Sequence, residues 1–257
     1  AIRKYYADLG MHFDAGDILI TNGGSEALQI AMNCILDDGD EILIPEPFYP
    51  NYNTMAYTCG AKIHPIPTSP HDGYHYADRA KVEAEINEHT RAIMCTNPGN
   101  PTGTVLTPEE MRMMVDIAKE HGLFIIGDEA YREFSDNPPD TLKFVREGRN
   151  VVVLRTFSKA YGLAGLRVGY GIAPEPVCSM LHKARAPFNL HVLAQEAALA
   201  ALEDREHVRR TVENNKEGMR FYEQAFREMG LEWIPSQGNF ILVKVGRGKQ
   251  VFQDMLA

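Results

Sequence analysis

Short apolar runs alternate with segments of helical periodicity along most of this chain. The apolar runs are DILIT, EILIP, AIMCTN, LFIIGDE, NVVVLRT and LRVGYGI, and helical segments such as SEALQIAMNCIL and PEEMRMMVDIAKEHG lie between them. Strands that are buried on both faces lose the polar alternation of half-exposed strands. The pattern therefore predicts an α/β domain with a mostly parallel sheet that helices cover on both faces.

One predicted helix has both of its ends marked in the sequence. Thr107 is followed by Pro108 and, three residues on, by Glu110, which is a capping box with proline at the first helical position. Gly122 is a plausible stop for this helix. We therefore expect the helix to fill the interval between Thr107 and Gly122.

The pattern changes in the last third of the chain. From about Ala173 it becomes mainly helical, and GLEWIPSQGNFILVKV then returns to strand character. We expect residues 1–230 to form one large domain and residues 231–257 to begin a smaller α+β domain that is incomplete. Both ends look cut, because AIRKYYADLG and KQVFQDMLA read as helices without caps, so we expect a fragment of a longer protein.

The composition indicates which kinds of partner and which cellular compartment to expect. The formal net charge is −9, which does not favour a polyanion, so we expect no nucleic-acid partner. No apolar run approaches the roughly 18 residues of a membrane helix, and we expect no membrane partner and a cytoplasmic protein. The cysteines are far apart, which predicts buried, reduced thiols and no metal site. They are Cys34, Cys59, Cys95 and Cys178.

Glycine and serine follow the first predicted strand, and ligands of open parallel sheets bind at the carboxyl ends of strands. In ITNGGSEAL, Gly23, Gly24 and Ser25 lie between a strand and a helix. Free backbone N–H groups and the helix dipole at such a place favour a phosphate. The alternative is an ordinary tight turn in which Ser25 caps the helix.

Two further strand ends carry hydrogen-bonding side chains. CTNPGNPTG contains two Asn-Pro pairs and two glycines, and the rigid turn that these predict places Asn100 where it can bind a ligand oxygen. FIIGDEAY puts Asp128 and Glu129 directly after a buried strand, with the phenol of Tyr131 close behind. A desolvated carboxylate is costly without a positive partner, and none lies nearby in the sequence. A protonated ring nitrogen or a cation would satisfy Asp128, and a helix N-cap is the alternative.

The segment VVVLRTFSKAYGLAGLRVGYG carries Lys159 at the end of a buried strand. Such a lysine is usually solvated, but a partly desolvated amine near other cations is a nucleophile that forms a Schiff base with an aldehyde. Arg167 offers a fixed fork donor for a phosphate beside the hydroxyls of Thr156 and Ser158, unless it forms a structural ion pair. We expect the glycines of this segment to leave room for a flat ring and for close approach of the chain. They are Gly162, Gly165, Gly169 and Gly171.

These interpretations fit one ligand. Lys159 would capture an aldehyde, Asp128 would keep a ring nitrogen protonated, and a ring oxygen would bind Asn100 and Tyr131. A phosphate would bind Ser25, Thr156, Ser158 and Arg167. Pyridoxal 5′-phosphate carries all of these groups, and we expect it to be the cofactor.

With NPGNPTG, GDEAY and SK…GLAGLRVGYG in this order, the sequence resembles the fold-type I aminotransferases of the aspartate aminotransferase superfamily along essentially its whole length. The resemblance implies that Lys159 forms the Schiff base with the cofactor and later moves protons. It also implies that Asp128 contacts the pyridine nitrogen, and that Asn100 and Tyr131 contact the phenolic oxygen.

The same resemblance indicates which residues bind the phosphate and which residue covers the face of the ring. The residues that resemble the phosphate-binding cup are Gly24, Ser25, Thr156, Ser158 and Arg167. Tyr49, in PEPFYPNY, lies where relatives place an aromatic ring that stacks on the cofactor. A core tyrosine without a function is the alternative for Tyr49.

The activity that the resemblance implies is a ping-pong amino transfer between an amino donor and a 2-oxo acid such as 2-oxoglutarate, in a homodimer. The second half, with KARAPFNLHVLAQEAALAALED, resembles histidinol-phosphate aminotransferases. The first half, with ITNGGSEALQIAM, resembles aspartate, aromatic or broad-specificity enzymes. We favour histidinol phosphate as the donor, because the second half flanks Lys159.

Two other functions remain open from the sequence. A lyase or decarboxylase with the same cofactor is one, because a fold determines the cofactor better than it determines which bond breaks. A non-catalytic ligand-binding domain of a regulator is the other, although the acidic balance and the lack of a visible helix-turn-helix speak against it. Relatives bind the substrate carboxylate with an arginine beyond GNFILVKV and close the site with an N-terminal segment. This chain lacks both, so we expect it to bind the cofactor yet turn over poorly.

Overall fold

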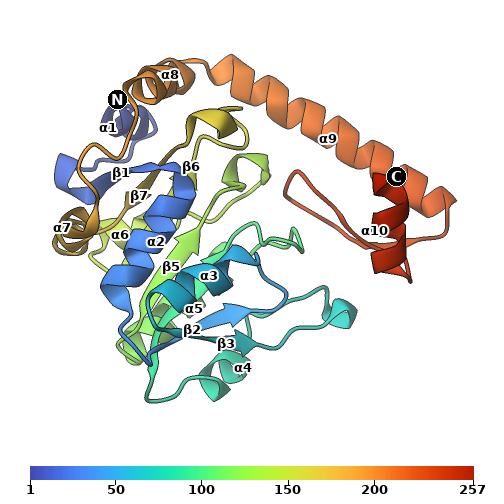
Figure 1. The fold of residues 1–257 in the computed structure, drawn as a ribbon, viewed down its shortest axis with the longest axis horizontal. Helices are drawn as coiled ribbons and strands as arrows, with labels where there is room; N and C mark the ends of the chain where they lie inside the picture. Colours follow the sequence, from blue (N-terminus) through green and yellow to red (C-terminus); the bar gives the residue numbers. More distant parts are fainter.

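A seven-stranded sheet forms the centre of the protein, whose computed structural model describes residues 1–257 (Figure 1). The strand order is β1-β7-β6-β5-β4-β2-β3. The strands are β1 (Ile18–Asn22), β2 (Glu41–Pro45), β3 (Lys62–Ile66), β4 (Thr90–Thr96), β5 (Phe124–Asp128), β6 (Val151–Thr156) and β7 (Val168–Ile172). Only the two pairs that involve β7 are antiparallel. The predicted mostly parallel sheet is therefore confirmed.

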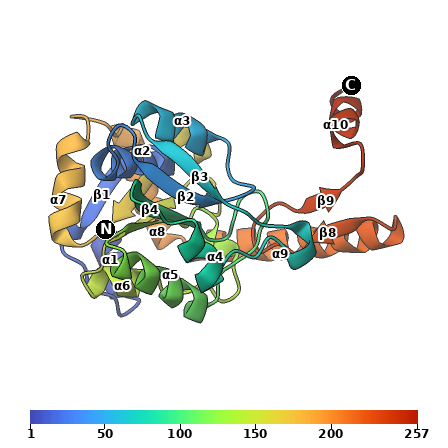
Figure 2. The same cartoon turned by 90° about the horizontal axis from the view of Figure 1, so that it is seen from below.

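Helices cover both faces of this sheet (Figure 2). The helices that pack on one face are α2 (Gly23–Ile35), α3 (Asn51–Thr58) and α7 (Glu175–Ala184). Those on the other face are α1 (Ile2–Ala7), α4 (Arg79–Ala84), α5 (Pro108–Glu120), α6 (Leu142–Arg146) and α8 (Val192–Glu203). Short 3-10 turns lie at Ala15–Asp17, Pro70–Asp72, Arg132–Phe134 and Ala164–Leu166.

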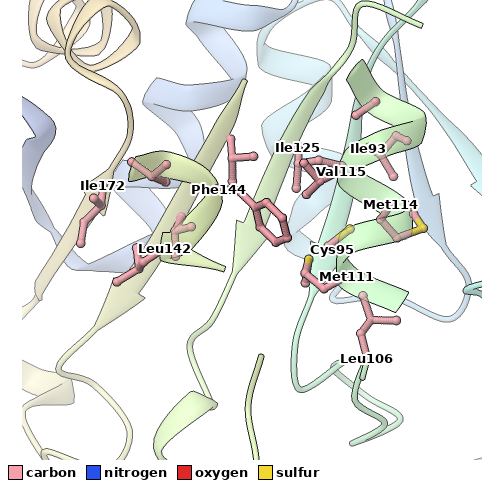
Figure 3. Close-up of a cluster of buried hydrophobic side chains, with 14 of the residues drawn as sticks. Ile93, Cys95, Leu106, Met111, Met114, Val115, Ile125, Leu142, Phe144 and Ile172 are labelled. Atoms are coloured by element: carbon pink, nitrogen blue, oxygen red, sulfur yellow. The ribbon is translucent and has the colours of Figure 1, made fainter. Parts of the chain in front are cut away.

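The strands contribute alternate residues to two separate apolar clusters. In β6, Val151 and Val153 belong to the cluster on one face, whereas Val152 and Leu154 belong to the cluster on the other. Figure 3 shows part of the first cluster, where side chains of α5 and α6 meet those of β4 and β5. Because both faces are apolar, the strands show continuous apolar runs in the sequence.

Of the two helix starts considered from the sequence, that of α5 is confirmed and that of α2 is not. In α5 the predicted capping box is present: Thr107 Oγ1 accepts from the backbone N–H of Glu110 at 3.2 Å, and the Glu110 carboxylate accepts from that of Thr107 at 2.7 Å. In α2 the N-cap is Asn22 and the helix begins at Gly23, so the alternative in which Ser25 caps the helix is wrong. The physical reason is that the chain turns from β1 into the helix at Gly23, whose φ of +75° a glycine adopts without strain, so Ser25 already lies inside the first turn.

The last part of the chain forms a separate small sheet. Helix α9 (Arg205–Glu228) leads from α8 to the antiparallel pair β8 (Glu232–Ile234) and β9 (Leu242–Lys244), and α10 (Gly248–Leu256) follows (Figure 1). The β8–β9 connection returns to the large sheet, where the Gln237 N–H donates to the Gly103 carbonyl at 2.8 Å. The domain boundary near residue 230 stays a prediction. None of the helices is long and apolar enough to cross a membrane.

The cysteines are unpaired, as expected, but they are not all buried. Cys95 and Cys178 lie in the interior, and burial raises the pKa of each thiol to about 12. Cys34 and Cys59 are only half-buried, so the expectation of burial is wrong for these two. Cys34 lies near the end of α2 and Cys59 directly after α3, and both pack at the margin of the apolar cluster between these helices and the sheet.

Candidate active site

A cavity of about 230 Å³ lies beyond the carboxyl ends of the central strands. Every residue that the resemblance assigned a contact with the cofactor lines it. These residues are Gly24, Ser25, Tyr49, Asn100, Asp128, Tyr131, Thr156, Ser158, Lys159 and Arg167. The cavity is also lined by residues that the sequence analysis did not single out, namely Leu28, Tyr52, Thr96, Ala130 and Ala164. The structure thus gathers residues from distant parts of the sequence around one space.

The first turn of α2 forms one wall, and two glycines bring it close to the sheet. A Cβ atom on Gly169 of β7 would overlap the backbone of Gly23 and Gly24. A Cβ on Gly23 would overlap the guanidinium of Arg167. The N–H groups of a first helical turn have no partner within the helix, and they carry the positive end of its dipole. This wall is therefore suited to an anion.

Hydroxyl groups and a guanidinium stand opposite this helix turn. The Thr156 hydroxyl donates to Ser158 Oγ at 2.9 Å, and Arg167 Nη1 lies 3.2 Å from the same oxygen. Arg167 also donates to the Ala164 carbonyl at 2.8 Å and forms no ion pair, so the alternative of a structural ion pair is wrong. Its φ of +54° is unusual for a residue with a side chain and turns the guanidinium back over Gly23.

Asp128 ends β5 and presents a buried carboxylate to the cavity. Tyr52 OH donates to Oδ2 at 2.8 Å, and the backbone N–H of Ala130 donates to Oδ1 at 3.1 Å. Burial raises the pKa of Asp128, while these two hydrogen bonds and the charge of Lys159 lower it. A protonated nitrogen in the cavity would complete the partners of this carboxylate.

Lys159 is half-buried beside Tyr131. Its Nζ lies 4.9 Å from the centre of the Tyr131 ring and has no carboxylate partner within ion-pair distance. Asn100 Nδ2 donates to the Tyr131 hydroxyl at 3.1 Å. The edge of Tyr131 contacts Phe240 of the β8–β9 connection, with ring centres 5.0 Å apart. An amine, an amide and a phenol therefore converge on the same side of the cavity.

Glu129 has its main partner on the neighbouring strand and a second one, Arg132 Nε at 3.5 Å, only three residues on. The expectation that no positive partner lies nearby in the sequence is therefore wrong for Glu129. Its Oε2 accepts from Arg155 Nη2 at 2.6 Å and from Arg155 Nε at 2.9 Å, and both side chains are almost fully buried. Adjacent acidic residues thus point to different places. Glu129 is neutralised inside the protein, and Asp128 faces the cavity.

Two interpretations from the sequence need correction or refinement. None of Gly162, Gly165, Gly169 and Gly171 lines the cavity, so the expectation that they leave room for a flat ring is wrong. The expectation of close chain approach holds for Gly169. Tyr49 is half-buried at the cavity and accepts a hydrogen bond from Asn51 at 2.7 Å, so it is not a core tyrosine. The fully buried tyrosine of this segment is Tyr52.

The sequence analysis missed Tyr52 and Thr96. Tyr52 OH contacts Thr96 Oγ1 at 2.9 Å as well as Asp128. A signal for Thr96 was available in the sequence, because it ends the apolar run that forms β4, and the structure places it beside Asp128 at the end of β5. Tyr52 follows Tyr49 by three residues, and the two rings contact each other with their centres 5.5 Å apart.

The fold and the cavity define the large domain of an aminotransferase. The chain belongs to the aminotransferase class I and II family, whose model matches residues 1–257. Members of this family depend on pyridoxal 5′-phosphate. The donor set of the cavity fits that cofactor: an anion-binding helix turn with a guanidinium, an isolated carboxylate, and an amine beside a phenol and an amide.

Curated relatives with the same name match almost the whole chain. A histidinol-phosphate aminotransferase of Akkermansia muciniphila is 66% identical over 242 residues, which cover 94% of this chain and 66% of the relative. Histidinol-phosphate aminotransferase 2 of Carboxydothermus hydrogenoformans is 40% identical over 244 residues, covering 93% of this chain and 66% of the relative. This chain therefore spans slightly less than two thirds of the length of these proteins.

Solved structures show the same fold. An aspartate aminotransferase of Thermotoga maritima superposes with a TM-score of 0.91 at 28% identity, covering 99% of this chain and 69% of that one. A putative histidinol-phosphate aminotransferase of Erwinia carotovora superposes with a TM-score of 0.89 at 25% identity, covering 99% of this chain and 73% of that one.

Proposed function

We propose that this chain is the cofactor-binding part of an aminotransferase that transfers an amino group from histidinol phosphate to 2-oxoglutarate in a ping-pong cycle. The observation that supports the donor is the 66% identity to a protein of that name, which extends over both halves of the chain. The motifs of the two halves resemble different subfamilies, but the relatives named histidinol-phosphate aminotransferase align across both.

Different residues of the cavity would bind different groups of the cofactor. Pyridoxal 5′-phosphate would supply an aldehyde that exchanges with the substrate amine and a ring that takes up the electrons of the broken bond. Asp128 would hold the proton on the ring nitrogen, and Asn100 and Tyr131, which line the same cavity, would donate to the ring oxygen. Tyr49 covers the ring face. The phosphate is held by Gly24, Ser25, Thr156, Ser158 and Arg167.

Lys159 is the reactive group of this proposal. Its Nζ would hold the cofactor through the aldehyde group when no substrate is present, and the free amine would accept the α-proton of the amino substrate. The phenol of Tyr131 lies directly beside Nζ, which keeps the amine over the cavity rather than in solvent. Asp128, through the ring nitrogen, and Tyr131, through the ring oxygen, would support this proton transfer.

A screen of amino donors tests the function. The purified chain is saturated with pyridoxal 5′-phosphate and mixed with histidinol phosphate, aspartate, glutamate or an aromatic amino acid, while the absorbance of the bound cofactor is followed. We expect histidinol phosphate to convert the cofactor to its amino form fastest, and 2-oxoglutarate to restore the original spectrum. Conversion that needs no 2-oxo acid to complete a cycle would instead indicate a lyase.

An aspartate or broad-specificity aminotransferase is the second candidate, because solved aspartate aminotransferases share the fold with TM-scores up to 0.91. Fastest conversion by aspartate would favour it. A chain that binds the cofactor but converts it with no donor would favour a non-catalytic ligand-binding domain.

The proposed enzyme is a homodimer in the cytoplasm. An exposed apolar segment supports self-association, because Phe188, Val192 and Leu193 are largely solvent-accessible in the single chain. Light scattering during gel filtration tests the dimer, and a monomer at all concentrations would contradict it. Fractionation of cells that produce the full-length protein tests the location.

A further inference from the structure

A chain of hydroxyl groups ends on the carboxylate that faces the cofactor cavity. Tyr52 OH donates to Asp128 Oδ2 at 2.8 Å. A phenol has a single hydrogen, so the 2.9 Å contact between Tyr52 OH and Thr96 Oγ1 is a hydrogen bond that Thr96 donates. The donor direction therefore runs from Thr96 to Tyr52 and from Tyr52 to Asp128.

This chain of hydroxyls lies in the inner wall of the cavity, where little of its surface is exposed. Tyr52 is fully buried and Asp128 is buried, so a lost hydrogen bond leaves a desolvated oxygen. The charged groups that act on Asp128 are Lys159, which favours its ionised form, and Glu129, which opposes it. Among the groups that lower the pKa of Asp128 against the effect of burial, the hydrogen bond from Tyr52 is the largest.

We propose that Tyr52, supported by Thr96, is a positioning residue that keeps the Asp128 carboxylate ionised and fixed in orientation towards the cavity. The inference rests on the proposed function, because a ring nitrogen needs an ionised carboxylate to stay protonated. Tyr52 itself acts through Asp128. Its phenol supplies the hydrogen bond that stabilises the charge, and the Thr96 hydroxyl orients that phenol.

A titration of the cofactor-free chain tests the charge state directly. The chain is labelled with ¹³C in its aspartate side chains, and the Asp128 carboxyl signal, assigned with Asp128→Asn, is followed by NMR as a function of pH. We expect Tyr52→Phe to move its midpoint to higher pH, because the ionised form loses a donor. Tyr57→Phe is the matched control from the same helix, since Tyr57 is 83% exposed, and its midpoint should equal that of the wild type. An unchanged midpoint in Tyr52→Phe would overturn the proposal.

A second pair of variants separates the hydrogen bond from packing. Thr96→Val keeps the shape but removes the donor, whereas Thr96→Ser keeps the donor. We expect Thr96→Val to shift the Asp128 midpoint in the same direction as Tyr52→Phe, and Thr96→Ser to restore the wild-type value. If Tyr52→Phe fails to fold, the two Thr96 variants test the proposal instead. Equal Asp128 midpoints in Thr96→Val and Thr96→Ser would overturn it.

The loaded chain gives an independent readout. The rate of cofactor conversion in Tyr52→Phe should fall about tenfold or more at neutral pH, and its acid limb should move to higher pH, with little change in the donor concentration for half-saturation. Failure of the proposed function has a different signature, because the wild type would then bind no cofactor or convert it with no donor. A wild type that converts the cofactor, with a variant of unchanged pH profile, would overturn only the role of Tyr52.

Discussion

The guanidinium of Arg155 and the carboxylate of Glu129 form a buried ion pair, with Arg155 Nη2 2.6 Å and Arg155 Nε 2.9 Å from Glu129 Oε2. Arg155 also donates to Tyr6 OH of α1 at 2.6 Å. The pair joins the carboxyl ends of β5 and β6, because Glu129 follows Asp128 and Arg155 precedes Thr156. It therefore holds the two strand ends that carry opposite walls of the cavity.

Removal of one partner of this pair should destabilise the whole chain. We expect Arg155→Met to lower the free energy of unfolding by about 3–5 kcal/mol, because the buried Glu129 would lose both of its hydrogen-bond donors and keep only Arg132 at 3.5 Å. Urea unfolding followed by circular dichroism measures the change. In the double variant Arg155→Met with Glu129→Leu, a large part of the loss should be recovered, since neither member of the pair is left buried without the other.

A pair on the surface provides the control for this prediction. Arg209 pairs with Glu206 and Glu213 on α9, and all three side chains are more than half exposed. Arg209→Met should change the free energy of unfolding by about 0–1 kcal/mol. Equal losses in Arg155→Met and Arg209→Met would contradict the importance of burial.

Gly169 should tolerate no side chain. In Gly169→Ala the new methyl group would overlap the backbone of Gly23 and Gly24, so the first turn of α2 must move away from β7. We expect a loss of about 1–3 kcal/mol in stability and at least a tenfold weaker binding of pyridoxal 5′-phosphate, measured by unfolding and by fluorescence titration. Gly171→Ala is the matched control on the same strand, because its Cβ would meet the Leu154 side chain at an ordinary 3.5 Å. Equal affinities in the two variants would contradict this explanation.

Lys159→Ala should lose the covalent attachment of the cofactor. After incubation with pyridoxal 5′-phosphate, borohydride reduction and dialysis, mass spectrometry should find the added mass on the wild type and not on the variant. The rate of amino transfer should fall by at least about 10²-fold. Lys183→Ala, which changes an exposed lysine of α7, should keep the adduct. An adduct of equal yield on Lys159→Ala would place the reactive amine elsewhere.

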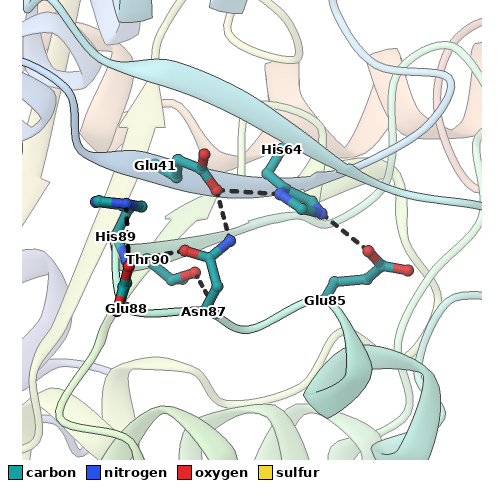
Figure 4. A network of polar contacts seen from close by, with 7 residues as sticks. All are labelled: Glu41, His64, Glu85, Asn87, Glu88, His89 and Thr90. Atoms are coloured by element: carbon teal, nitrogen blue, oxygen red, sulfur yellow. Dashed lines mark hydrogen bonds and ion pairs between the residues drawn. The ribbon is translucent and has the colours of Figure 1, made fainter.

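His64 should make stability depend on pH. Figure 4 shows its ring between two carboxylates: Nδ1 is 3.0 Å from Glu41 Oε2, and Nε2 is 2.8 Å from Glu85 Oε2. The Glu85 hydrogen bond, with that of Glu41, raises the pKa of His64 above its ordinary value of 6.5. The hydrogen bond from Asn87, followed by that of His64, lowers the pKa of Glu41.

The two shifts determine the pH window. A raised folded pKa means that the His64 contribution is complete below about pH 6.5 and is lost as the pH rises through the folded pKa. A lowered folded pKa means that the Glu41 contribution is lost only as the pH falls through that folded value. We expect His64→Gln to remove about 1 kcal/mol of stability near pH 6 and much less above pH 8, measured by urea unfolding at each pH. A constant difference across this range would contradict the titration of His64.

Local signals in the sequence were sufficient for several elements. The capping box of Thr107 and Glu110 predicted the start of α5, because both partners lie within one helical turn. The continuous apolar runs predicted strands covered on both faces, because burial on two sides leaves no place for polar side chains. The polar residues that follow β1, β4, β5 and β6 at the cavity were predictable because parallel strands bring their carboxyl ends to one edge, whichever strands are neighbours.

Contacts between distant segments were decided by the tertiary structure alone. Glu129 pairs with Arg155, and Asp128 with Tyr52, across separations of 26 and 76 residues that no local pattern specifies. Gly169 is required because α2 packs onto β7, not because of its own turn. The sequence by itself determined the class of fold and the chemical groups at the site, since these follow from periodicity and residue type. Only the tertiary structure decided which buried groups neutralise one another, because that depends on strand order and side-chain direction.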